Sequence, residues 1–154
     1  LCRIIAWMLP VVIWFRNRFW LGVLYFWVLA GTFQGIITPV LTGGFPNYFY
    51  FRYWFLHAGL VVAILYAIII FKVRITWKDF WRAIGLAQIY LILVHLVNLT
   101  LGSNYSFTMR KPSGGSILDL MGPWPIYVFA GELLMIVLFV LLMLPWKKSM
   151  GHRA

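Results

Sequence analysis

The chain has 154 residues, of which 64% are hydrophobic and only 10% are charged, and its mean hydropathy is +0.91. A soluble domain of this size has too little interior to hide so much apolar surface, so the composition excludes that class and indicates a membrane protein. The net charge of +10 does not indicate nucleic-acid binding, because the basic residues lie between apolar runs, where membrane-flanking anchors are found.

Five apolar runs, separated by Arg, Lys, Pro and Gly, predict an all-α, polytopic transmembrane bundle that forms one domain over residues 1–154. The predicted helices cover residues 1–15, 19–41, 50–71, 83–102 and 124–146. The first run begins at Leu1 and is too short to cross a hydrocarbon core of about 30 Å by itself. We therefore expect an N-terminally truncated fragment. Between the third and fourth spans, the Trp-containing segment 75–82 predicts a short interfacial helix.

The basic residues are shared unevenly between the two sides of this topology. Nine Lys and Arg lie after the first and third helices and in the C-terminal tail, against three on the opposite side. Because short basic loops stay in the cytoplasm, we expect a plasma-membrane protein with a cytoplasmic C-terminus and an outward-facing loop 103–123. A loop of this length is usually functional. Arg110 and Lys111 in it predict a lipid-headgroup contact, either as phosphate ligands or as interfacial anchors.

Each predicted span carries one polar side chain of chemical interest: Cys2, Gln34, His57, His95 and Glu132. At about 1.5 Å of rise per residue, all five lie about 18–22 Å from the cytoplasmic end of their helices. Because polar groups that face lipid are costly, we predict that the five share one pocket in the outer half of the bundle. The Gly31–Gly35 pattern, GxxxG, favours a close helix contact that turns Gln34 inward.

These side chains are the parts of a Cys–His acyl-transfer site. The thiol of Cys2 is the only strong nucleophile among them, and the imidazole of His57 is suited to remove its proton. Glu132 or Gln34 is suited to hold the imidazole in one tautomer, as the third member of a catalytic triad does. The single cysteine excludes an intrachain disulfide, and no paired metal-ligand motif or cofactor motif is present.

Structural roles remain open for the same residues. A cysteine in a membrane helix is often a small apolar filler. The alternative role for His57 is a hydrogen bond to a neighbouring helix, and His95 has the same alternative. Arg3 either favours the thiolate of Cys2 or forms an ion pair with Glu132.

The outer loop resembles a known family. The segments Asn104-Tyr105, Arg110-Lys111-Pro112, Ser116-Ile117-Leu118-Asp119 and Gly122-Pro123-Trp124-Pro125 look like the signature of the bacterial YwaF-type integral membrane proteins. Cys2, Gln34, His57 and Glu132 match in order, so the resemblance covers nearly the whole chain. That family is similar to the transmembrane protein 164 acyltransferases, whose catalytic Cys and His correspond by motif order to Cys2 and His57.

The resemblance implies an acyl-cysteine intermediate formed from a membrane phospholipid, with His57 as general base and Asn104 and Tyr105 in the supporting pocket. The leading hypothesis is therefore a phospholipid acyltransferase or acyl hydrolase whose partners are membrane lipids. The rival is a non-enzymatic transporter or lipid-binding protein that uses the same pocket for a cation or a headgroup. The rival predicts that Cys2→Ala is tolerated and Glu132→Gln is not, whereas acyl transfer predicts the reverse.

Overall fold

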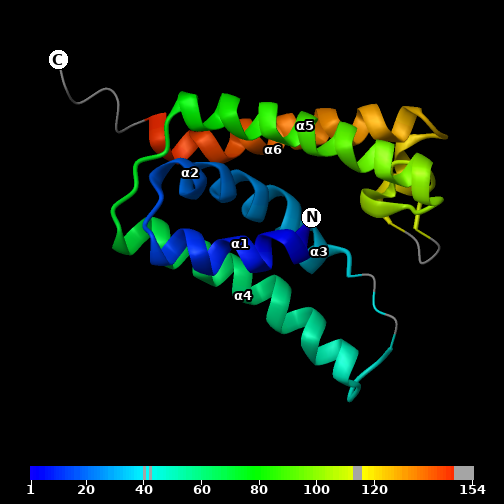
Figure 1. The fold of residues 1–154 in the computed structure, drawn as a ribbon, viewed down its shortest axis with the longest axis horizontal. Coiled ribbons are helices and arrows are strands. Elements are labelled where there is room, and N and C mark those ends of the chain that lie inside the picture. The colour runs from blue at the N-terminus through cyan, green and yellow to red at the C-terminus, as the bar shows by residue number, and fades with distance from the viewer. Residues whose placement is uncertain (40, 42, 113–115, 148–154) are drawn as a thin grey trace.

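The computed structural model describes residues 1–39, 41, 43–112 and 116–147, and within them the chain is all-α (Figure 1). Four helical stretches are long and apolar enough to cross a membrane: Arg18–Ile37, Tyr48–Ile70, Trp77–Leu101 and Ile126–Trp146. The shorter apolar helix α1, Cys2–Trp14, precedes them. The connections alternate between the two ends of the bundle. The predicted polytopic helical class is confirmed.

A broken helix lies at the centre of the bundle and consists of α2 (Arg18–Phe26), the π-helical turn η1 (Trp27–Thr32) and α3 (Phe33–Ile37). Every residue from Leu21 to Val28 is buried, as expected for a helix that is apolar all round. Trp27 Nε1 donates to the Ala83 carbonyl at 3.0 Å, and Tyr25 Oη donates to the Leu142 carbonyl at 3.0 Å. These bonds join α2 and η1 to α5 (Trp77–Leu101) and α6 (Ile126–Lys147), and they satisfy the polar groups of the Trp27 and Tyr25 rings.

The predicted separate interfacial helix at residues 75–82 is wrong, because α5 runs unbroken through this segment. Asp79 accepts hydrogen bonds from Thr76 N and Thr76 Oγ1 at 2.9 and 2.8 Å, which caps the helix start. Asp79 also pairs with Arg18 of α2, with an N–O distance of 2.6 Å. A Cβ on Gly22 would lie only 2.5 Å from Asp79 Oδ1, so the helices approach closely here. Asp79, one of the charged residues that suggested a break between spans, instead links α5 to α2 through its ion pair with Arg18.

The other predicted boundaries agree with the structure to within two residues, with one exception. The second span ends at Ile37 and not at residue 41. Pro39 explains the early end, since proline cannot donate a backbone hydrogen bond and disfavours helical geometry in the residue before it. The third span is α4, Tyr48–Ile70, which begins after its N-cap Asn47.

The long connection between α5 and α6 folds over one end of the bundle and carries two short 3-10 helices, η2 (Tyr105–Phe107) and η3 (Ile117–Met121). The buried side chain of Asn98 fixes its first part by donating to the Tyr105 carbonyl and to Thr108 Oγ1, both at 2.8 Å. Asn98 Oδ1 accepts from Ser103 Oγ at 2.7 Å and from Tyr105 N at 2.8 Å. One buried amide thus sets the path of the chain from α5 into η2.

Candidate active site

Cys2 and His57 meet between the start of α1 and the middle of α4. The thiol and the imidazole line the same cavity as neighbours in its wall. Both residues are half-buried, so neither side chain is turned fully into the surroundings of the bundle. Two of the five polar residues predicted to share a pocket therefore do so, and they are a nucleophile and a base.

Tyr53, one helical turn before His57 on α4, holds the imidazole in position. His57 Nδ1 lies 2.8 Å from the Tyr53 carbonyl oxygen. Because a carbonyl only accepts, Nδ1 carries the proton, and in the neutral ring Nε2 keeps the lone pair that a base needs. The Tyr53 ring also stacks on the imidazole, with ring centroids 4.1 Å apart. Tyr53 therefore takes the orienting role that the sequence analysis gave to Glu132 or Gln34.

Gly35 of α3 forms the wall behind the imidazole. A Cβ at this position would lie 2.8 Å from His57 Cδ2 and 3.1 Å from His57 Nε2. The Gly35 carbonyl accepts a hydrogen bond of 2.6 Å from the Tyr53 hydroxyl. The glycine pattern at Gly31 and Gly35 thus marks a close helix contact, as predicted, and its second glycine makes room for the histidine.

Thr32 provides a second polar neighbour for the thiol. Its Oγ1 lies 3.7 Å from Cys2 Sγ, and the residue is fully buried. Thr32 is the last residue of η1, the π-helical turn in the central helix. Such turns change the direction in which the following side chains point, and they are frequent at functional sites. The hydroxyl therefore reaches the sulfur from a third helix, in addition to α1 and α4.

A cavity of about 730 Å³ opens beside the thiol and the imidazole. Its wall is formed by α1, α4, α5 and the outer loop, and besides Cys2 and His57 it includes Arg3, Arg52, Tyr53, Tyr90, Tyr105 and Ser106. Tyr105 was predicted to support the pocket and lies in this wall. The Tyr90 hydroxyl and Ser106 Oγ are 2.9 Å apart, so α5 and η2 are joined at the edge of the cavity.

The sequence model of the TMEM164 family matches residues 1–143, which include the whole of this site. The chain belongs to the TMEM164 family. No curated protein and no solved structure gives a significant match. Family membership and the four apolar helices together identify a multi-pass membrane protein.

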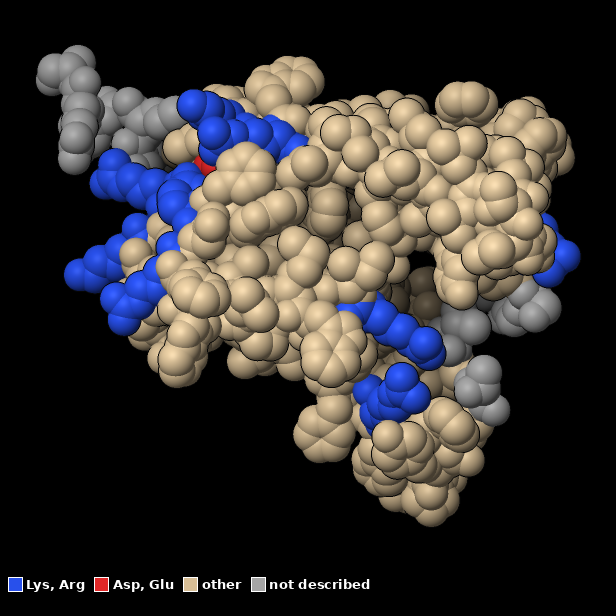
Figure 2. Space-filling model, in the orientation of Figure 1, with Lys and Arg blue, Asp and Glu red and all other residues tan. Residues whose placement is uncertain are grey.

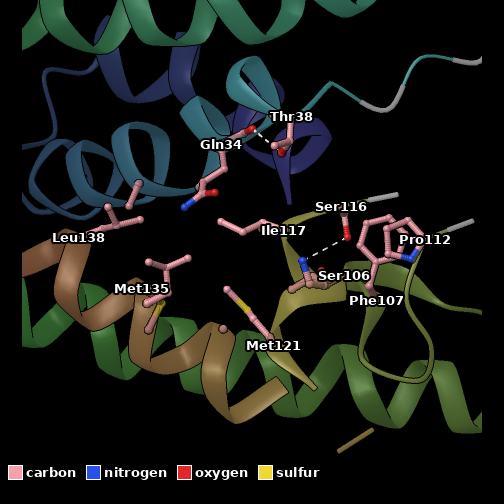
Figure 3. A pocket seen from close by; sticks show the side chains of 16 residues that line it. Gln34, Thr38, Ser106, Phe107, Pro112, Ser116, Ile117, Met121, Met135 and Leu138 are labelled. Carbon is pink, nitrogen blue, oxygen red and sulfur yellow. Dashed lines mark hydrogen bonds between the residues drawn. The ribbon is translucent and has the colours of Figure 1, made fainter. Parts of the chain in front are cut away.

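The structure of this TMEM164 family chain does not gather all five predicted polar groups, so the prediction of one common pocket is wrong. Gln34 lines a second cavity of about 390 Å³ between α3, the outer loop and α6. Figure 3 shows its carboxamide pointing into that cavity, opposite Ile117 and Met135. The two cavities share Ser106 in their walls, but Gln34 does not line the one that holds the thiol.

Glu132 and His95 also lie outside the Cys2–His57 cavity. Glu132 accepts a hydrogen bond from the Gln88 side chain, which joins α6 to α5. Among residues 1–39, 41, 43–112 and 116–147, none of the ion pairs involves Glu132, so the suggested pairing with Arg3 is not formed. His95 Nδ1 lies 3.2 Å from Thr108 Oγ1, which joins α5 to the outer loop. Both residues connect neighbouring segments.

The loop residues Asn104, Arg110 and Lys111 shape or border the outer connection. Asn104 Oδ1 accepts from the backbone N–H groups of Met109 and Arg110, both at 3.1 Å, and its Nδ2 donates to the Arg110 carbonyl at 2.7 Å. Asn104 therefore supports the cavity by holding the loop that carries Tyr105. Lys111 lies 3.9 Å from Asp119 Oδ1, and Arg110 is exposed on the loop surface.

Three neighbours of the site were not predicted from the sequence: Tyr53, Thr32 and Arg52. Tyr53 could have been predicted, because residues four apart on a helix share a face, and an aromatic ring at that spacing from His57 is a natural stacking partner. The contact of Thr32 could not have been predicted, since the direction of its side chain depends on the π-helical turn. Arg52 was counted only as a membrane-flanking charge, although it follows the start of α4 by about one turn.

Proposed function

We propose that this chain is a membrane-embedded acyltransferase or acyl hydrolase that acts on a phospholipid through Cys2 and His57. The observation that carries the proposal is the meeting of a thiol and an imidazole in one cavity wall, with the imidazole Nδ1 already bound to the Tyr53 carbonyl. This arrangement leaves Nε2 for the thiol proton, which is what general-base activation of a cysteine requires. Membership of the TMEM164 family supports a membrane setting for this chemistry.

In the first half of the reaction, His57 Nε2 takes the thiol proton while Sγ attacks the carbonyl carbon of a lipid ester. A tetrahedral adduct forms, the ester C–O bond then breaks, and the departing lysophospholipid oxygen receives the proton from His57. The acyl group remains on Cys2 as a thioester. The Thr32 hydroxyl, 3.7 Å from Sγ, is positioned to donate a hydrogen bond to the thiolate.

In the second half, an acceptor hydroxyl gives its proton to His57 and attacks the thioester carbon. The C–S bond breaks, and His57 returns the proton to the sulfur. A lipid alcohol as acceptor gives acyl transfer, and water gives hydrolysis. Both half-reactions use only the two protein groups and the two substrates, so no redox partner is required.

We also infer that the C-terminus faces the cytoplasm of a plasma-membrane protein and that the catalytic cavity lies in the outer half of the bilayer. Figure 2 shows Lys and Arg side chains gathered at one end of the bundle, over the connections from α1 to α2 and from α4 to α5. Arg16, Arg18, Lys72 and Arg74 line one hollow there. Basic connections of this kind stay on the cytoplasmic side.

The deciding experiment incubates purified protein with vesicles of phosphatidylcholine that carries a radiolabelled acyl chain, and measures hydroxylamine-labile label on the protein. The proposal expects label on the wild type, none on Cys2→Ala and a strong reduction on His57→Gln. Glu132→Gln keeps a side-chain oxygen for the hydrogen bond from Gln88, so it should retain the label. If Glu132→Gln abolishes lipid binding while Cys2→Ala behaves as wild type, the non-enzymatic rival replaces this proposal.

A further inference from the structure

We propose that Arg3 and Arg52 form a phosphate-binding subsite in the wall of the Cys2–His57 cavity, and that the adjoining apolar groove between α1 and α4 holds an acyl chain of the same glycerophospholipid. The inference rests on the proposed function and adds the orientation of the substrate. Both arginines line the cavity and both are exposed.

Within the described residues, neither of these two arginines forms an ion pair with a side-chain carboxylate. The chain has three acidic side chains against thirteen basic ones. All three acids lie within the described residues and are engaged elsewhere. Their partners are Arg18 and Arg82 for Asp79, Lys111 for Asp119 and Gln88 for Glu132.

An anion from outside the chain is therefore the natural partner of Arg3 and Arg52. A guanidinium group matches phosphate geometry with two parallel N–H donors, and it stays charged at any physiological pH. Two such groups around one cavity suit a phosphodiester. Figure 2 shows basic side chains over the start of α1 and over α4, beside a hollow in the surface and away from the basic end of the bundle.

The groove next to this cavity is apolar. It has a volume of about 810 Å³, runs between α1 and α4, and shares Arg52 and Leu56 with the wall of the Cys2–His57 cavity. From there it continues past Leu9 and Leu60 to Ala63. An acyl chain that lies in this groove from Arg52 onward would thus pass from a charged end to an apolar one, as a phospholipid does from headgroup to tail.

The spacing along α4 agrees with this orientation. Arg52 and His57 are five residues apart, which is about 7.5 Å of helix rise. In a glycerophospholipid only a few covalent bonds separate the phosphate from the neighbouring ester carbonyl. A phosphate held at Arg52 therefore brings an ester to the level of the imidazole, where Cys2 can attack it.

The test measures lipid binding without catalysis, in the Cys2→Ala background. The probes are dioctanoylphosphatidylcholine, dioctanoylglycerol with the same chains but no phosphate, and inorganic phosphate as competitor. Adding Arg3→Gln and Arg52→Gln should weaken phosphatidylcholine binding about tenfold or more, the loss expected for charge-assisted hydrogen bonds, and leave dioctanoylglycerol binding unchanged. Arg74→Gln, which removes an arginine at the opposite end, is the matched control.

Equal binding of the phospholipid and the diglyceride, unaffected by the two substitutions, would overturn the inference. So would inorganic phosphate that binds as tightly as the phospholipid, since the site would then serve a free anion. Arg52→Lys keeps the charge and should retain most of the preference for phospholipid, which separates charge loss from misfolding. If arginine-dependent phospholipid binding is found but the wild type forms no acyl adduct, the subsite stands and the proposed catalysis fails.

Discussion

Gly35→Ala is the substitution whose effect on the candidate site follows most directly from the structure. The added Cβ would lie 2.8 Å from His57 Cδ2, whereas ordinary contacts begin at 3.4 Å. It would also lie 3.2 Å from the Tyr53 hydroxyl. Neither ring can retreat freely, because the imidazole is stacked on Tyr53 and Tyr53 is bonded to the Gly35 carbonyl.

To restore an ordinary contact of 3.4 Å from the present 2.8 Å, the imidazole must move about 0.6 Å away from the new Cβ. This movement changes its position relative to the thiol. Misplacement of a reacting group by about 1 Å costs about a hundredfold in rate, so we expect thioester formation on Cys2 to slow by about ten- to a hundredfold. Overpacking lowers the free energy of unfolding by about 1–3 kcal/mol. The higher helix propensity of alanine than of glycine offsets about 1 kcal/mol of this loss.

The assay is the time course of hydroxylamine-labile acylation from labelled phosphatidylcholine, with thermal unfolding measured on the same samples. Gly85→Ala is the matched control, because Gly85 lies on α5 with nothing within 4 Å of its would-be Cβ. This control should acylate at the wild-type rate and gain up to about 1 kcal/mol of stability. A Gly35→Ala protein with wild-type acylation would refute the argument that this glycine sets the position of His57.

Three further substitutions test other contacts. Tyr53→Phe keeps the stacked ring but removes the 2.6 Å hydrogen bond to the Gly35 carbonyl. We expect the acylation rate to fall by about three- to tenfold in the kinetic assay, and the free energy of unfolding to fall by about 1 kcal/mol in a denaturant titration. Thr32→Val removes the hydroxyl beside Cys2 Sγ at nearly constant volume and should slow acylation by about threefold or more with a stability change below about 1 kcal/mol; unchanged kinetics would show that the hydroxyl only fills space. Gly22→Ala places a methyl group 2.5 Å from the carboxylate at the start of α5 and should lower the unfolding temperature by several degrees while leaving the acylation rate per folded molecule intact.

The helical spans were predictable because hydropathy alone marks a segment that must cross hydrocarbon. The start of α5 was not, since Lys78, Asp79 and Arg82 resemble a polar break when only the sequence is available. In the structure the carboxylate of Asp79 is buried against Arg18, 61 residues earlier in the chain. A contact of that sequence separation has no local signature, so its effect on a helix boundary cannot be read from one segment.

The depth of each site residue in the membrane could be predicted from the sequence, but the direction of its side chain could not. Counting residues gives the height of a side chain in the membrane, but the direction in which it points changes by about 100° with each residue. Gln34 and Glu132 have suitable heights and line other interfaces. Cys2 and His57 have suitable heights and also line the same cavity, which depends on the relative rotation of α1 and α4 that only the folded bundle defines.

The π-helical turn η1 has a consequence for how insertions and deletions would act in this chain. A deletion within Trp27–Thr32 would barely shorten the central helix, because the wide turn would relax to ordinary α-helical winding. The residues that follow would keep nearly the same direction around the axis, because a π-helical turn holds one residue more than the α-helical turn that replaces it. Gly35 would therefore still face α4. A deletion within the regular helix α2 has no such extra residue to lose, so it would rotate Gly35 by about 100° away from the imidazole and empty the site without removing any of its side chains.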